Sequence, residues 1–149
     1  TYDKLIKLVT DIPTSYNMLH SDYHLKNVML QNGEILLIDM DTLSTGNKVF
    51  EFAFMYNAYQ GYGSLDHNKT EGFLGISWDD ASYVWNQSLK LYFSDKSEEE
   101  LEDIKNKAKL IGTIRMLRRL IRTHDSKEEI DSKKQTIIDL VNKVDSLAL

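Results

Sequence analysis

The dipeptide Asn32-Gly33 stands between two short apolar runs, and it restricts the possible folds of the chain more than any other feature. Two residues of this type between apolar segments are the strongest short-range signal for a β-hairpin. We therefore expect strands over residues 28–31 and 34–38. Because the two ends of a hairpin lie side by side, the residues before 28 should lie next to those after 38.

A polar loop enters this hairpin and an acidic segment leaves it. The loop reads His-Ser-Asp-Tyr-His-Leu-Lys-Asn over residues 20–27, and the exit reads Ile-Asp-Met-Asp over residues 38–41. The hairpin should make Asn27 and Asp39 spatial neighbours. One carboxylate that orients an accepting hydroxyl, with an Asn and a second carboxylate that hold magnesium, is what a phosphoryl-transfer centre needs.

Three residues of these segments are therefore candidates for chemistry. Asp22 is the candidate catalytic base, and Asn27 and Asp39 are the candidate Mg²⁺ ligands, because Mg²⁺ prefers oxygen and takes few ligands from protein. Asp41 is either a second metal contact or a cap of the following turn. Each residue alone would ordinarily serve a turn or a strand end, and it is their joint spacing that favours the functional interpretation.

The two histidines of the loop, His20 and His24, leave two interpretations open. They hold the loop by hydrogen bonds, or they join Asp22, Asp39 and Asp41 in a transition-metal cluster of the kind found in metal-dependent phosphohydrolases. The spacing counts against the cluster, since the other two histidines of the chain sit in unrelated segments.

Helical spacing of apolar residues dominates the rest of the chain. We expect helices over 2–9, 48–60, 77–93, 98–122 and 127–146. The expected N-caps of the last three are Ser77, a capping box at Ser97, and Asp125 or Ser126. Residues 61–76 are expected to form a loop. The predicted fold class is α+β, mostly helical, in a single domain over residues 1–149.

Composition excludes several classes of protein. The chain has no cysteine, which excludes disulfides and thiolate metal sites and fits a reducing compartment such as the cytoplasm. No apolar run approaches the length of a membrane span, so no membrane partner is expected. The net charge of −5 argues against a nucleic-acid partner and is compatible with a cationic small-molecule acceptor.

The helix expected over 98–122 carries a basic run near its end. Its members are Arg115, Arg118, Arg119 and Arg122. Pairing with acids on neighbouring helices is the ordinary explanation, and a site for phosphate or another anionic partner is the alternative.

Residues 20–53 resemble the aminoglycoside phosphotransferase and choline kinase branch of the protein-kinase-like fold. That family carries a His-Gly-Asp-x-His-x-x-Asn loop and, after a hairpin, Ile-Asp. The matching residues here are His20, Asp22, His24, Asn27, Ile38 and Asp39. Residues 46–53, Gly-Asn-Lys-Val-Phe-Glu-Phe-Ala, are similar to the Gly-Asp-Pro-x-Phe-Asp-Leu-Ala of the family.

The chain departs from the family pattern without losing a catalytic group. Ser21 replaces the loop glycine, and Glu51 replaces an aspartate. Leu25-Lys26 stands where Pro-Gly is common, and Met40-Asp41 stands where Phe-Gly often follows the metal-binding aspartate.

The resemblance implies a C-terminal kinase-like lobe. Asp22 would be the catalytic base, Asn27 and Asp39 the Mg²⁺ ligands, His20 and His24 the supports of the loop, and ATP or GTP the donor to a small-molecule hydroxyl. It also implies a nucleotide-binding N-terminal lobe, in cis or in trans, because residues 1–19 contain no strand-rich, glycine-rich segment. We therefore expect these 149 residues alone to be inactive. A catalytically idle binding or regulatory module is the alternative.

Overall fold

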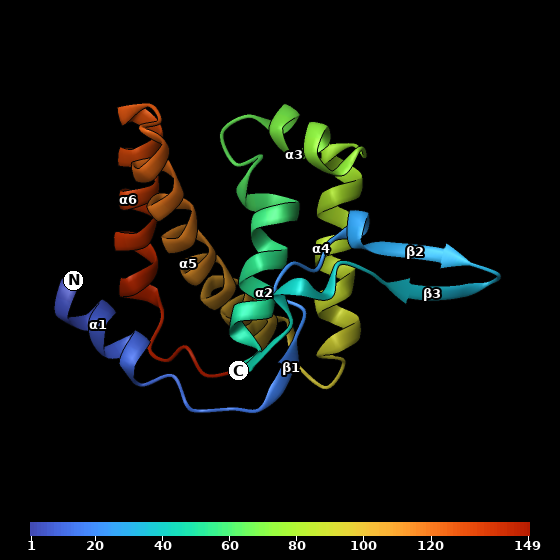
Figure 1. The fold of residues 1–149 in the computed structure, drawn as a ribbon. Coiled ribbons are helices and arrows are strands. Elements are labelled where there is room, and N and C mark those ends of the chain that lie inside the picture. Colours follow the sequence, from blue (N-terminus) through green and yellow to red (C-terminus); the bar gives the residue numbers. More distant parts are fainter.

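The computed structural model describes residues 1–149 and shows an α+β, mostly helical fold, with 63% of the chain in helices (Figure 1). The α-helices are α1 (Tyr2–Thr10), α2 (Val49–Tyr56), α3 (His67–Leu74), α4 (Trp78–Tyr92), α5 (Glu98–Thr123) and α6 (Lys127–Lys143). Shorter helical turns are η1 (Leu25–Asn27), η2 (Met40–Thr42) and η3 (Asn57–Gly61). The strands are β1 (Asn17–Leu19), β2 (Val28–Gln31), β3 (Glu34–Leu37) and β4 (Ser44–Gly46). The predicted fold class is confirmed at this level.

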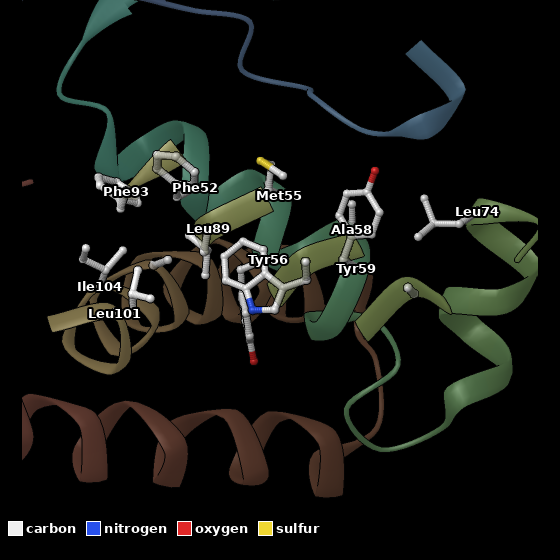
Figure 2. Packing of buried hydrophobic residues seen from close by; sticks show 13 residues of the cluster. Phe52, Met55, Tyr56, Ala58, Tyr59, Leu74, Leu89, Phe93, Leu101 and Ile104 are labelled. Atoms are coloured by element: carbon white, nitrogen blue, oxygen red, sulfur yellow. The ribbon is translucent and has the colours of Figure 1, made fainter. Parts of the chain in front are cut away.

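Helices supply the core. Helix α5 packs most extensively against α6 on one side and α2 on the other. One cluster of 13 buried residues joins α2, η3, the end of α3, α4 and the first half of α5, and Figure 2 shows its aromatic centre. A second cluster of 10 joins α1, α2, α5 and α6. No helix combines the length and apolar character that crossing a bilayer requires.

The hairpin forms where the sequence predicts it. Strands β2 and β3 pair antiparallel, with Val28 opposite Leu37 and Gln31 opposite Glu34. Both turn residues have positive φ, 53° at Asn32 and 83° at Gly33, as a type I′ turn requires. The hairpin extends away from the helical body (Figure 1). Its base therefore meets the body, and its tip does not.

The predicted helix starts are confirmed at their caps. Ser77 Oγ accepts a hydrogen bond from the Asp80 amide. Ser97 and Glu100 form the predicted capping box. Ser126, rather than Asp125, caps α6, because its Oγ accepts the Glu129 amide.

The prediction of a loop over residues 61–76 is wrong, because α3 occupies half of that range. Asp66 caps α3 by accepting the Asn68 amide, and Gly75 ends it at a φ of 76°. The helix buries only Thr70 and Leu74, so its apolar pattern in the sequence is weak.

The helix expected over 48–60 changes character after Tyr56 and continues as the π-helical turn η3. Strands β1 and β4 were not predicted, and they pair antiparallel although 24 residues lie between them. Each has three residues, too few for a periodic pattern.

Candidate active site

The loop between β1 and η1 is fixed at its second residue. Ser21 has a φ of 65°, a left-handed conformation that residues other than glycine rarely adopt. Its amide donates to Glu51 Oε2 at 3.0 Å, and its hydroxyl lies 2.9 Å from that of Ser44. These contacts attach the loop to α2 and β4, so that the unusual backbone turn presents the next residue, Asp22, outward.

Asp22 and Asn27 lie together. The Asn27 Nδ2 donates to the Asp22 carbonyl at 2.8 Å and lies 3.4 Å from the Asp22 carboxylate. Asn27 is buried, whereas about half of the Asp22 side chain is exposed (49%). The side-chain amide group of Asn27 thus holds Asp22 in place from the buried side. The Oδ1 of Asn27 accepts no hydrogen bond and remains able to bind a cation.

Asp39 lies at the same end of the hairpin. The amide of Ile38 donates to the Asn27 carbonyl at 3.0 Å, which confirms the prediction that the two ends of the hairpin are neighbours. Asp39 itself has left-handed backbone angles, φ 62° and ψ 58°, and immediately precedes η2. Asp22 thus directly follows a strained backbone position, and Asp39 occupies one. Such strain is often found at functional sites.

Negative charge concentrates at this point. The pKa of Asp39 is raised by a hydrogen bond to the Asp41 carboxyl, by repulsion from Asp41, and by repulsion from Asp22, while His20 acts in the opposite direction. Asp22 is therefore close enough to Asp39 for their charges to interact. A divalent cation held by Asn27 and Asp39 would relieve this repulsion, so the residues fit Mg²⁺.

The two histidines hold the loop from inside. His20 Nε2 lies 3.0 Å from the Ile38 carbonyl and donates to it, and the carbonyl of His20 accepts the Thr42 hydroxyl. His24 Nε2 lies 3.5 Å from Asp22 Oδ2, and its ring packs edge-on against Phe73. Both rings are buried, and the Nδ1 of each has no hydrogen-bond partner.

The His/Asp metal cluster does not form. No group of three or more His, Cys, Asp or Glu side chains is arranged to hold a metal ion. His20 is occupied by the hydrogen bond to a backbone carbonyl, and His24 points into the protein toward Phe73. The phosphohydrolase interpretation therefore loses the arrangement of ligands on which it depended.

Residues from distant parts of the chain lie near Asp22, and two of them, Asn57 and Phe73, were not identified from the sequence. A small hollow of about 30 Å³ beside Asp22 is also lined by Asn57, Tyr62, Phe73 and Arg115. They come from η3 and the residue after it, from α3 and from α5, all distant from Asp22 in the sequence, so no local pattern places them beside Asp22. Asn57 Oδ1 is buried there without a hydrogen-bond partner.

The four arginines of α5 are not paired as the ordinary explanation requires. None of them has a carboxylate within 4.0 Å. Instead, the Arg115 guanidinium lies 3.9 Å from the centre of the Phe54 ring, and that of Arg119 lies 5.8 Å from the Tyr62 ring. Both therefore turn toward the side of the molecule that carries Asp22.

Comparison with known proteins finds no match: no family model, no curated protein and no solved structure is significantly similar to the chain. The residues and the geometry described above are therefore the basis for a functional proposal.

Proposed function

We propose that this chain supplies the catalytic base and the magnesium ligands of a phosphotransferase similar to the aminoglycoside phosphotransferase and choline kinase family. The enzyme transfers the γ-phosphoryl group of ATP or GTP to a hydroxyl of a small molecule. One observation carries the proposal: Asp22, Asn27 and the strand end that leads to Asp39 meet at the base of one hairpin. The family motif requires this meeting, and the sequence alone separates Asn27 from Asp39 by eleven residues.

In the proposed reaction Asp22 orients the acceptor hydroxyl and takes its proton. The hydroxyl oxygen forms a bond to the γ-phosphorus while the bond from that phosphorus to the β–γ bridging oxygen breaks, and the nucleoside diphosphate leaves. Asn27 and Asp39 would hold Mg²⁺, which neutralises charge on the transferring group when it is bound. Asn27 also donates to Asp22 and so fixes the direction of the base.

The left-handed backbone at Ser21 supports the resemblance. The family has glycine at this position, and glycine is the residue that adopts positive φ without strain. Here serine adopts the same kind of conformation, with φ at 65°, and two hydrogen bonds hold it there. The substitution therefore does not remove the turn that presents Asp22.

Two alternatives remain distinct from this proposal. A catalytically idle kinase-like module would keep the fold without needing Asp22, Asn27 and Asp39 together. A metal-dependent phosphohydrolase would need the His/Asp cluster, which the structure does not form. In the leading proposal, further nucleotide contacts come from a lobe joined to this chain in cis or in trans.

The test is phosphoryl transfer by the native gene product that carries this sequence. ATP and GTP consumption would be measured with Mg²⁺ against amino-alcohol, aminoglycoside, sugar and hydroxy-acid acceptors. We expect Asp22→Asn to lower kcat about 100-fold or more, because general-base catalysis contributes at least that much. The control is Asp145→Asn, a substitution with the same charge change at an exposed position just after α6, where the carboxylate pairs only with Lys4.

Asp39→Asn tests the metal assignment in the same assay. We expect it to raise the Mg²⁺ concentration needed for half-maximal rate, since it removes a charged ligand. Asp41→Asn decides the second role: a matching rise makes Asp41 a metal contact, and no rise makes it a turn residue. Full activity in Asp22→Asn, or no turnover with any acceptor, would reject the phosphotransferase proposal and favour the idle module.

A further inference from the structure

A second, larger cavity lies beside the active-site hollow. It has a volume of about 420 Å³ and lies between η3, α3 and the adjoining ends of α5 and α6, which share one end of the molecule (Figure 1). That volume is within the range of small-molecule sites. Its polar and aromatic lining includes Tyr62, Lys69, Phe73, Arg119, Glu129 and Lys133.

The cavity connects to Asp22 through shared side chains. Tyr62 and Phe73, whose ring centres are 5.5 Å apart, line both the cavity and the hollow beside Asp22. Arg115 lines the hollow, and Arg119, one helical turn further along α5, lines the cavity. A molecule in the cavity can therefore extend toward Asp22 along a continuous surface.

Lys133 is the cation at the base of this cavity. It is only 6% exposed, and its Nζ lies 2.5 Å from Ser64 Oγ and 3.5 Å from the Gly61 carbonyl. These contacts lie at the C-terminal end of η3 and hold the ammonium group of Lys133 there. An ammonium group has three donors, however, and these two contacts leave one unused. No carboxylate lies within 4.0 Å of it, and burial lowers its pKa, which an anion nearby would reverse.

The other charges of the cavity compensate Lys133 only in part, because Glu129 raises the pKa of Lys133 whereas Lys69 lowers it. Lys69 and Glu129 form an ion pair with each other. Asp125 accepts the hydroxyl of Thr123. Arg119 rests on the Tyr62 ring without a carboxylate partner. Two unpaired cations therefore face one unpaired carboxylate.

We infer that this cavity binds an anionic group, a carboxylate or a phosphate, on the acceptor whose hydroxyl is phosphorylated at Asp22. Phosphorylation of the hydroxyl rests on the proposed function, whereas binding of the anion rests on the cavity alone. The whole-chain charge of −5 suggests a cationic acceptor, but the charges within reach of the ligand favour the opposite sign. An acceptor with a hydroxyl at one end and an anion at the other would span the two hollows.

The inference is tested by titrating the isotope-labelled chain with four small probes and following amide signals by NMR at low ionic strength. Glycerate and glycerol differ in one carboxylate, choline supplies the cationic comparison, and inorganic phosphate is the fourth probe. We expect glycerate or phosphate to shift the signals of Gly61, Tyr62 and Phe73, and glycerol and choline to leave them in place. A response to glycerate alone identifies a carboxylate site, and a response to phosphate alone identifies a phosphate site.

Two neighbouring arginines provide matched variants. We expect Arg119→Gln to weaken binding of the anion about tenfold, because a charged donor is lost. Arg118→Gln makes the same charge change on an exposed residue outside the cavity lining and should have little effect. Lys133→Met should weaken binding similarly, and if that buried variant does not fold, the arginine pair still decides the question.

The failures of the two proposals are distinguishable. Equal shifts with glycerol or choline, no shift with either anion, or equal weakening by Arg118→Gln and Arg119→Gln would overturn the anion site. Anion binding that depends on Arg119 would support the site even if the native gene product transferred no phosphoryl group. Transfer that prefers choline to glycerate would reject an anionic acceptor and keep the phosphotransferase.

Discussion

Leu89 and Leu91 are two leucines of α4 with opposite environments, and they offer a direct test of how this helix packs. Leu89 is completely buried and belongs to the cluster of 13 residues shown in Figure 2. Leu91 is 77% exposed. The same substitution to alanine at the two positions therefore separates the effect of burial from the effect of helix propensity.

The expected cost of Leu89→Ala follows from the atoms removed. Three buried carbons are lost, and at about 0.8 kcal/mol each their transfer contributes about 2.4 kcal/mol. The surrounding side chains come from α2, α4 and α5 and include large rings such as Trp85 and Phe52, so we expect the cavity to collapse only partly. The cavity adds to the transfer term, and the total decrease in the free energy of unfolding should be about 3–4 kcal/mol.

Urea unfolding measures this difference, with Trp85 as a fluorescent reporter one turn from Leu89. The melting temperature of Leu89→Ala should fall by about 10 °C, given the usual relation for a chain of this size. Leu91→Ala should change the free energy of unfolding by no more than about 0.5 kcal/mol. A loss below about 1 kcal/mol at Leu89, or an equal loss at both positions, would show that the buried face of α4 is wrongly identified.

Three further predictions test packing, pH dependence and capping. Gly112→Ala should lower the free energy of unfolding by about 1–3 kcal/mol, because the new Cβ would lie 2.7 Å from Asn57 Oδ1 and 2.9 Å from a backbone oxygen. As the control, Gly72→Ala, in open space on α3, should raise the free energy of unfolding by about 0.5–1 kcal/mol in the same urea experiment. Burial raises the pKa of Tyr56 from its ordinary 10.0 to about 12, so the stability that the neutral phenol contributes is complete below pH 10 and is lost between pH 10 and pH 12. Urea unfolding between pH 10 and pH 12 should show this decrease in the free energy of unfolding in the wild type, and the decrease should be smaller by about 2–3 kcal/mol in Tyr56→Phe. An identical pH dependence in the two proteins would contradict the buried, neutral state of Tyr56. Ser97→Ala should cost about 1 kcal/mol by removing the cap of α5, and an unchanged melting temperature would show that the first turn of α5 contributes nothing.

Local chemistry made part of the structure predictable. The Asn32-Gly33 turn needs two residues that tolerate positive φ, and this requirement is visible in the sequence. The caps at Ser77 and Ser97 likewise depend on residues within one helical turn. The neighbourhood of Asn27 and Asp39 followed from the hairpin alone.

Features that depend on distant contacts were not predictable in this way. Strand β1 exists because it pairs with β4, and neither has a pattern of its own. Helix α3 has few buried residues, so its caps carried more information than its apolar pattern. Phe73 and Arg115 reach the neighbourhood of Asp22 only because α3 and α5 pack around η3. The acidic centre was thus predictable, whereas its surroundings required the tertiary fold.

The hairpin between Asn27 and Asp39 also affects whether the molecules associate with one another in concentrated solution. Its outer half exposes Leu30 and Ile35, which face each other in register and are 74% and 75% exposed, and each strand leaves one backbone edge unpaired. Such an edge is a template for strand addition by another molecule. At neutral pH the net charge of −5 keeps the molecules apart. Acidification toward zero net charge removes that repulsion. The molecules should then associate through their hairpin edges, and the solution should become turbid while the helical body is still folded.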